Sequence, residues 1–245
     1  MNFKDKVVVI TGGANGIGKI ITEEFMAAGA QAAVIDLDCT KVPSNFYFQG
    51  DIAEEETLAR FASKVIDHFG KIDYLINNAC LSRKGILSGC SFEDFNYVLR
   101  VGVSAPYQLT RLFLEHFNDK GAVVNISSSR AFMSQADTES YTAAKGGITA
   151  LTHAMSVSLA GKVRVNSIAP GWIDTTRDTW GEADENQHPV KRIGKPSDIA
   201  RTVMFLCSED SGFINGENIT VDGGMTKLMI YHNDHGWRYE GDSGD

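Results

Sequence analysis

Short apolar runs alternate along this chain with longer stretches of helical period, and no other feature of the sequence restricts its fold as strongly. Apolar runs without polar alternation are typical of strands that are buried on both faces of a sheet. When such strands alternate with helices, they build repeated units of strand, helix and parallel strand. We therefore predict an α/β fold, in which a single doubly wound parallel sheet of about seven strands carries helices on both faces.

The apolar runs and the periodic stretches place the predicted elements. Strands are expected at residues 6–11, 32–36, 45–50, 74–77, 122–126, 163–168 and 219–221, and helices at residues 17–28, 54–69, 92–118, 141–159 and 196–207. Only residues 42–50 interrupt the alternation, because the connection from the second strand to the third is too short for a full helix. A loop or a single turn is expected there.

The first 225 residues contain no internal repeat, low-complexity block or linker, so we expect one domain at residues 1–225. Residues 226–245 differ in composition and form a C-terminal tail. Tyr231, Trp237 and Tyr239 favour partial docking of this tail, for which a neighbouring subunit is one possible surface. The glycine-containing acidic end, residues 240–245, is expected to be disordered.

Composition and charge exclude several classes of protein. No apolar run approaches the roughly 18 residues that a membrane span needs, and the run at residues 7–11 is too short for the core of a signal peptide. The net charge of −8 has the wrong sign for binding nucleic acid. We expect a cytoplasmic protein with no nucleic-acid or membrane partner.

The cysteines point to reduced thiols. They lie far apart, with no CxxC pair and no histidine cluster nearby, so neither a disulfide framework nor a metal site is expected. The four residues are Cys39, Cys80, Cys90 and Cys207.

A glycine-rich segment, TGGANGIG at residues 11–18, joins the first predicted strand to the first predicted helix. Glycines at such a turn let the backbone approach a pyrophosphate, and the helix N-terminus offers it free N–H groups and the positive end of a dipole. The same glycines would also suit a tight turn that needs positive φ angles. Their position between strand and helix favours dinucleotide binding and hence a Rossmann-type sheet.

Asp36 ends the second predicted strand, about twenty residues beyond the glycines, where an acidic side chain accepts hydrogen bonds from the adenosine ribose hydroxyls. Its charge would repel the 2′-phosphate of NADP. A site for NADP usually offers Arg or Lys at the next position or inside the glycine turn, where this chain has Leu37 and Asn15. We therefore predict NAD as the cofactor; the alternative is that Asp36 is a solvated residue at a strand end.

Tyr141 and Lys145 stand four residues apart in a predicted helix, so both side chains project from one face. Hydride transfer at a carbinol carbon needs a partner for the hydroxyl proton, and a phenol can serve when a neighbouring cation favours the phenolate. Ser128 ends a predicted strand, where ligand sites of parallel sheets open, and its hydroxyl could hold the substrate oxygen. The alternative is that Ser127, Ser128 and Ser129 only cap the next element, that Tyr141 is a partly buried aromatic residue and that Lys145 is solvated.

Taken in order, these motifs resemble those of the short-chain dehydrogenase/reductase family, oxidoreductases of roughly 250 residues, and the resemblance covers about residues 5–225. Extended Rossmann epimerases also carry YxxxK, but they are longer and space their glycines differently. The matching segments are the TGxxxGxG turn at 11–18, the adenine-binding pair Asp51 and Ile52, the NNA segment at 77–79, the catalytic residues Ser128, Tyr141 and Lys145, the PGxxxT stretch at 170–175, and later motifs at 192–196 and 221–224.

The resemblance implies that Tyr141 is the general acid/base, that Ser128 holds the substrate oxygen, and that Lys145 binds the nicotinamide ribose and favours the phenolate. It implies NAD(H)-dependent interconversion of a small secondary alcohol and its ketone. It also implies a homodimer or homotetramer assembled through the helices at 92–118 and 141–159. The cofactor-binding residues that it implies are Gly12, Asn15, Gly16, Ile17, Gly18, Asp36, Leu37, Asp51, Ile52, Asn78, Ala79, Cys80, Tyr141, Lys145, Pro170, Gly171, Ile173 and Thr175.

Two residues depart from the family pattern. Gly102 stands where the family usually has a catalytic asparagine, so we expect a slower or differently wired proton relay rather than an inactive enzyme. Glycine preserves the helix kink expected there, and Pro106 adds to it. Cys80 replaces the glycine of the NNAG segment; its side chain either crowds the adenosine ribose or fills space as a small hydrophobe, and we favour the second.

Residues 80–88, residues 130–140 and a lid at residues 176–191 are expected to face the substrate. Their basic residues suit an anionic or polyhydroxylated substrate, and their aromatic and methionine residues suit a ring, but solvated charges and lid packing are equally consistent. The basic candidates are Arg83, Lys84, Arg130 and Arg177, and the apolar ones are Phe132, Met133, Trp172 and Trp180.

Because Gly102 replaces the relay asparagine, a function of another class stays open. The chain could be an NAD-binding sensor or regulatory subunit with little turnover. The presence of Ser128, Tyr141 and Lys145 together argues against this alternative, since a pure binder needs neither hydroxyl.

Overall fold

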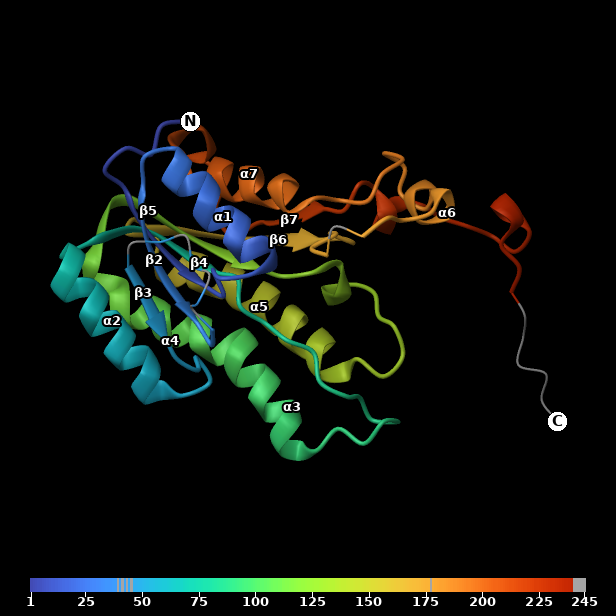
Figure 1. The fold of residues 1–245 in the computed structure, drawn as a ribbon, viewed down its shortest axis with the longest axis horizontal. Coiled ribbons are helices and arrows are strands. Elements are labelled where there is room, and N and C mark those ends of the chain that lie inside the picture. Colours follow the sequence, from blue (N-terminus) through green and yellow to red (C-terminus); the bar gives the residue numbers. More distant parts are fainter. Residues whose placement is uncertain (39, 41, 43, 45, 177, 240–245) are drawn as a thin grey trace.

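The computed structural model describes residues 1–38, 40, 42, 44, 46–176 and 178–239, and its centre is a seven-stranded parallel sheet (Figure 1). The strand order is β3-β2-β1-β4-β5-β6-β7, so the predicted doubly wound α/β fold is confirmed. The order reverses between β1 and β4, and ligands of such sheets bind at the carboxyl ends of the strands beside the reversal. The strands are β1 Val7–Thr11, β2 Gln31–Asp36, β3 Phe46–Gln49, β4 Ile72–Asn77, β5 Phe117–Ile126, β6 Val163–Pro170 and β7 Asn218–Val221.

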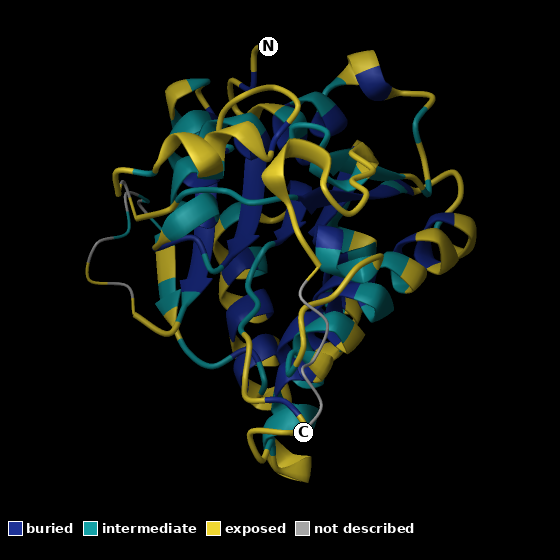
Figure 2. Cartoon of the chain, turned by 90° about the vertical axis from the view of Figure 1, so that its right-hand side faces the viewer, coloured by how far each residue is buried: buried dark blue, intermediate teal, exposed yellow. Residues whose placement is uncertain are grey.

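Helices cover both faces of the sheet. Successive residues of a strand point to opposite faces, so Val8 and Ile10 pack in one apolar layer while Val7 and Val9 pack in the other. Burial on both faces explains why the strands appear in the sequence as continuous apolar runs (Figure 2). No described helix is long and apolar enough to cross a membrane. One layer lies under α1 Gly16–Ala27 and α7 Pro196–Cys207; the other lies under α2 Glu55–Phe69, α4 Ala105–Phe113 and α5 Glu139–Ser158 (Figure 1).

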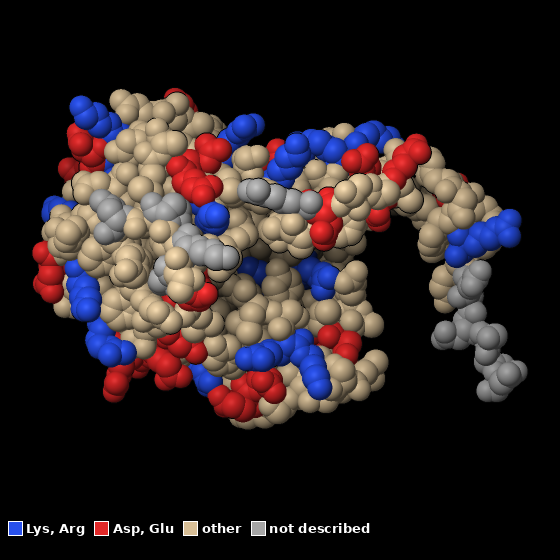
Figure 3. All heavy atoms as spheres, in the orientation of Figure 1, with Lys and Arg blue, Asp and Glu red and all other residues tan. Residues whose placement is uncertain are grey.

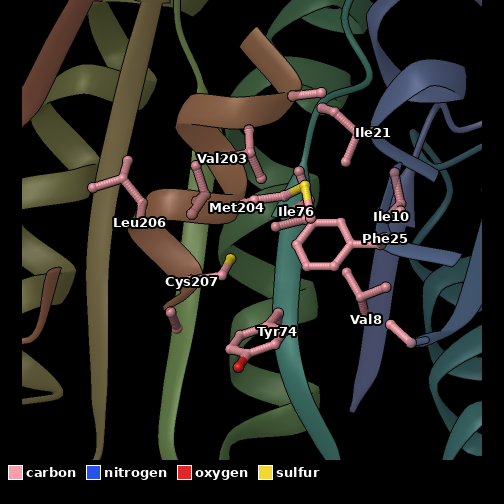
Figure 4. Packing of buried hydrophobic residues seen from close by; sticks show 14 of the residues in the cluster. Val8, Ile10, Ile21, Phe25, Tyr74, Ile76, Val203, Met204, Leu206 and Cys207 are labelled. Atoms are coloured by element: carbon pink, nitrogen blue, oxygen red, sulfur yellow. The ribbon is translucent and has the colours of Figure 1, made fainter. Parts of the chain in front are cut away.

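The layer under α1 and α7 has an aromatic group at its centre. Phe3, Phe25 and Tyr74 contact one another, with ring centroids 4.9 to 6.0 Å apart. Cys207 of α7 lies in the same layer (Figure 4), and burial raises the pKa of its thiol, so this cysteine is a neutral packing residue. Cys80, Cys90 and Cys207 are free thiols, whereas Cys39 lies outside the described residues.

The helix predicted at residues 92–118 is interrupted and ends early. Residues 117 and 118 belong to β5, which pairs with β4 through Phe117 and Ile72, so β5 begins five residues before its predicted start at residue 122. The prediction was wrong here because an amphipathic pattern does not reveal pairing with a distant strand. The segment consists of α3 Phe92–Leu99, a π-helical turn η1 Arg100–Ser104, α4, and a 3-10 turn η2 Leu114–His116.

The predicted lid contains a short helix that the sequence pattern did not indicate, α6 Glu182–Asn186. Asp184 stabilises its first turn, since the carboxylate accepts a hydrogen bond from the Gly181 N–H at 3.1 Å. The described residues between β2 and β3 form no helix, as expected, and the predicted strand start at residue 45 lies outside the described residues.

Residues 227–239 of the predicted tail are exposed and extend away from the sheet (Figure 1). This part of the tail is organised by its own contacts: the Trp237 carbonyl oxygen accepts from the Asn233 N–H at 2.8 Å, and the Trp237 and Tyr239 rings lie 6.4 Å apart. Docking of the tail on another surface stays a prediction. Residues 240–245, where disorder is predicted, lie outside the described residues.

Arg164 of β6 ties the end of α7 to the sheet, since its Nη2 donates to the carbonyl oxygens of Leu206 and Ser208 at 2.9 and 3.2 Å. We expect Arg164→Gln to lower the free energy of unfolding by about 2–4 kcal/mol, because these half-buried carbonyls lose their donor. Urea denaturation measures the change. The control Arg60→Gln, at an exposed position of α2, should change it by less than about 0.5 kcal/mol, and equal effects of both variants would contradict the prediction.

Candidate active site and cofactor site

The glycine-rich turn leaves β1 at Thr11 and enters α1 at Gly16, as predicted. Gly12 and Gly16 have φ angles of 66° and 54°, which glycine adopts at little cost. A Cβ on Gly18 would lie 2.1 Å from the Gly12 carbonyl oxygen, so no side chain fits there. Asn78 holds the turn from the end of β4, where its Nδ2 donates to the carbonyl oxygens of Thr11 and Gly12 at 3.1 and 3.0 Å. The backbone path therefore requires these glycines, and Asn78 keeps that path in place.

A cavity of about 630 Å³ opens above the N-terminus of α1. A Cβ on Gly16 would contact Thr175 Cγ2 at 3.5 Å, so the turn and the segment after β6 face each other here. Asn15, Lys19 and Lys195 also line this cavity. The N–H groups at the helix N-terminus and the two lysines supply the donors and positive charge that a pyrophosphate needs, so these residues fit a dinucleotide.

Asp36 lies beside the glycine turn, since its Oδ2 accepts a hydrogen bond from the Ala14 N–H at 2.9 Å. The next residue, Leu37, is exposed, and the turn itself carries Asn15, so neither position puts a cation beside this carboxylate. An acidic side chain at this place suits a ribose with free hydroxyls better than one that bears a 2′-phosphate.

Asp51, predicted at the adenine, is held on both of its oxygens. Oδ2 accepts from the Tyr97 phenol and Oδ1 from the Ala53 N–H, each at 2.9 Å. Burial and the hydrogen bond to Asp51 raise the pKa of Tyr97, which keeps this phenol a neutral donor. Ile52 is buried in the apolar layer under α2. Tyr97 of α3 is a site residue that the sequence did not indicate, because it meets Asp51 only through the tertiary fold.

The three predicted catalytic residues lie where β5 ends and α5 begins. Lys145 is only 4% exposed; its Nζ donates to the Ile126 carbonyl oxygen at 2.7 Å and lies 5.4 Å from the ring centroid of Tyr141. Ser128 is buried two residues beyond Ile126, and its Oγ accepts from the Arg130 N–H at 3.1 Å. The hydrogen bond from Lys145 thus brings the tyrosine–lysine pair to the strand end that carries the serine.

Polar side chains, most of which the sequence analysis did not single out, join α5, β5 and β4. Ser127 Oγ lies 2.7 Å from Thr149 Oγ1. Asn125 Nδ2 donates to Thr152 Oγ1 at 2.9 Å, and Asn125 Oδ1 accepts from Asn77 Nδ2 at 2.8 Å. A signal for them exists in the sequence, because polar residues inside the apolar strand run need buried partners.

The segment after β6 forms the other side of the cofactor cavity. Pro170 is buried at the end of β6, and a Cβ on Gly171 would lie 2.6 Å from Asp222 Cβ, so this crossing requires glycine. Ile173 forms a short parallel bridge with Gly194, which places Thr175 at the cavity. These predicted cofactor residues are therefore brought to the same place as the glycine turn.

Some of the residues expected at the substrate have other partners. Trp172 and Trp180 pack edge to face on each other, with ring centroids 4.8 Å apart, which is lid packing rather than two free rings. Arg83 pairs with Asp94 at 3.7 Å. Arg177 lies outside the described residues.

The two departures from the family pattern are in contact with each other. Gly102 lies in the π-helical turn η1, which is the form that the predicted kink takes. A Cβ on Gly102 would lie 2.9 Å from Ala144 Cβ of α5 and 3.3 Å from Cys80 Sγ. An asparagine fits here only if Ala144 or Cys80 moves. The small residue at position 102 therefore leaves the space that the larger residue at position 80 occupies.

Known proteins with similar sequences agree with this fold. A family model described as enoyl-(acyl carrier protein) reductase matches residues 12–226. An uncharacterized oxidoreductase of Thermotoga maritima is 36% identical over 94% of this chain and 99% of the relative. A (2S)-[(R)-hydroxy(phenyl)methyl]succinyl-CoA dehydrogenase subunit of Thauera aromatica is 33% identical over 92% of this chain and 98% of the relative.

Solved structures agree as well. An apo SCOR enzyme from Clostridium thermocellum has a TM-score of 0.90 and 46% sequence identity, over 96% of this chain and 98% of that one. A 4-hydroxyisoleucine dehydrogenase in complex with NADH has a TM-score of 0.83 and 27% identity, over 92% of this chain and 100% of that one. The chain therefore belongs to the short-chain dehydrogenase/reductase family, and it is a Rossmann-fold oxidoreductase.

The contact at Gly102 makes a prediction about stability. Gly102→Ala should lower the free energy of unfolding by about 1–3 kcal/mol, because the added methyl group overpacks the contact with Ala144. Gly146→Ala is the matched control, since Gly146 lies in α5 with nothing within 4 Å of its Cβ position. Urea denaturation at one protein concentration compares them. A neutral Gly102→Ala variant would show that the two helices have room to separate.

Proposed function

We propose that this chain is an NAD(H)-dependent oxidoreductase that interconverts a small secondary alcohol and its ketone. The observation that supports this most directly is the 2.7 Å hydrogen bond from Lys145 Nζ to the Ile126 carbonyl oxygen. It joins the helix that carries Tyr141 to the strand end that carries Ser128, at the same edge of the sheet as the glycine turn. The names of two similar proteins, the 4-hydroxyisoleucine and the hydroxy(phenyl)methylsuccinyl-CoA dehydrogenases, describe secondary alcohols as well.

The chain's own residues handle the proton and the substrate oxygen. The nicotinamide, when bound, supplies the hydride chemistry. Tyr141 takes the hydroxyl proton as the carbinol C–H bond breaks, so that alcohol and NAD⁺ give ketone, NADH and one proton. Ser128 donates a hydrogen bond to the substrate oxygen, and the Lys145 ammonium favours the phenolate and binds the nicotinamide ribose. Since Gly102 has no side-chain amide, we expect the proton to leave by a slower or different relay.

NAD is the proposed cofactor, and a symmetric oligomer is the proposed assembly. The Asp36 carboxylate beside the Ala14 N–H supports a ribose with free hydroxyls. A homodimer or homotetramer formed through α4 and α5 is supported by two exposed large side chains on these helices, Tyr107 and Val157.

Replacing Tyr141 with Phe tests the reaction. The rate of turnover should fall by about 10²–10⁴-fold, because the acid/base group is lost, while NADH binding stays nearly intact. NADH absorbance follows turnover with secondary alcohols, sugars, polyols, hydroxysteroids and the matching ketones. Tyr47→Phe, on an exposed side chain of β3, is the control and should keep full activity.

A Tyr141→Phe variant that keeps most of its activity would refute the assignment of Tyr141. If the parent protein binds NADH tightly but turns over no member of the panel, the result favours the sensor or regulatory alternative.

The cofactor preference is tested by binding. We expect NADH to bind at least about tenfold more tightly than NADPH, because Asp36 repels the 2′-phosphate. Asp36→Ser should reduce this ratio by weakening NADH and relieving the repulsion. Fluorescence titration measures the four dissociation constants, and comparable affinities of the parent for both cofactors would contradict the proposal.

A further inference from the structure

The guanidinium group of Arg130 lies beside Tyr141 and has no part in the proposed proton transfer. Arg130 belongs to the 3-10 turn η3 Ser129–Ala131, directly after Ser128. Its Cζ lies 6.0 Å from the ring centroid of Tyr141, over the ring face, and the backbone N–H of Arg130 donates to Ser128 Oγ at 3.1 Å. The guanidinium therefore lies over the ring of Tyr141, and the backbone of Arg130 is bonded to the Ser128 hydroxyl.

Arg130 is positioned by a neutral partner. Its Nη2 donates to Gln135 Oε1, and an amide oxygen orients a guanidinium without cancelling its charge. In the described part of the chain no acidic side chain forms an ion pair with Arg130. Three other arginines do have such partners, Arg83 with Asp94, Arg100 with Glu93 and Arg192 with Asp198.

The acidic residues nearest in sequence are bound elsewhere. Asp137 Oδ1 accepts from the N–H groups of Leu87 and Ser88 at 2.9 and 3.1 Å, and Glu139 Oε2 accepts from the Ile86 N–H at 3.0 Å. Hydrogen bonding from Ser88 lowers the pKa of Asp137, which keeps this carboxylate charged and in place. The two acids thus join the segment after η3 to the loop after β4, and neither of them pairs with Arg130.

The two loops pack closely against each other at Gly85. A Cβ on Gly85 would lie 2.3 Å from Asp137 Oδ1 and from Glu139 Oε2. The joined loops also carry exposed apolar side chains, which are Ile86, Leu87, Phe132 and Met133. Figure 3 shows a hollow in this face of the molecule with basic side chains in it, although the whole chain has a net charge of −8.

We propose that Arg130 binds the carboxylate of a hydroxy acid or keto acid, and that the apolar loop residues contact the rest of that substrate. This inference rests on the proposed alcohol–ketone reaction and names its substrate class. A planar guanidinium suits a carboxylate because it can donate two parallel hydrogen bonds. Because the guanidinium lies over the ring of Tyr141, the proposed acid/base, a carboxylate bound to it would belong to the molecule whose hydroxyl reacts there.

The test compares acids with neutral molecules of the same shape. The 2-, 3- and 4-oxohexanoates and their amides are titrated into the protein–NADH complex by calorimetry, and the oxidation of NADH is followed with the same compounds. We expect at least one acid to bind at least about tenfold more tightly than its amide. Arg130→Gln should weaken binding of that acid by about 10- to 100-fold, leave the amide within about threefold, and raise KM more than it lowers kcat.

Two further variants separate charge from structure. Arg130→Lys should keep part of the preference for acids, because lysine has the positive charge but cannot donate two parallel hydrogen bonds. Arg83→Gln is the matched control, because Arg83 Cζ also lies over a tyrosine ring, 5.4 Å from the centroid of Tyr97, but Arg83 is paired with Asp94. This variant should leave the preference for acids unchanged. Circular dichroism confirms that each variant is folded.

The proposal is overturned if no acid is preferred over its amide, if the preference survives in Arg130→Gln, or if Arg83→Gln abolishes it equally. Failure of the proposed reaction gives a different result. In that case an acid binds through Arg130 with the expected preference, but no member of the series oxidises NADH.

Discussion

The hydrogen bond from the Lys145 ammonium to the Ile126 carbonyl oxygen is the interaction on which the candidate site depends. A buried ammonium is costly unless it is paired, so α5 cannot slide along β5 or turn away from it without that cost. Tyr141 lies one helical turn before Lys145, and Ser128 lies two residues after Ile126. One contact between a helix and a strand therefore sets the positions of both hydroxyl groups, and the contact between the hydroxyls of Ser127 and Thr149 reinforces it.

Close approach of backbones is the second constraint on the site. Gly18 lets α1 start against the turn, and Gly171 lets the chain leave β6 against Asp222. Gly102 lets the π-helical turn pack against α5, where the sulfur of Cys80 fills the neighbouring space. These contacts leave the backbone little freedom to move at three places around the candidate site. At Gly102 the chain therefore lacks the side-chain amide that the family usually has there, and it has little room for one beside Ala144 and Cys80.

Much of this arrangement could be predicted from residues close together in the sequence. The glycine turn at 11–18, the strand end at Asp36 and the helical pair Tyr141 and Lys145 are local patterns, and the structure places each on the expected element. The predictions that were wrong or missing depend on distant partners. β5 starts at Phe117 because it pairs with Ile72 of β4, and Tyr97 reaches Asp51 from 46 residues away. Neither pairing leaves a periodic signal in its own segment.

The sequence by itself determined the class of the sheet, the order of its elements along the chain, the family and the residue types available for chemistry. Local sterics and burial explain this, since the alternation of apolar runs with helical period is enough to specify strands and helices. Only the tertiary structure decided that Cys80 lies beside Gly102 and that the carboxylates of Asp137 and Glu139 accept hydrogen bonds from the loop after β4. It also decided that the Arg130 guanidinium lies over the ring of Tyr141. Such pairings depend on which side chains remain without partners once the whole chain is packed, and no short segment carries that information.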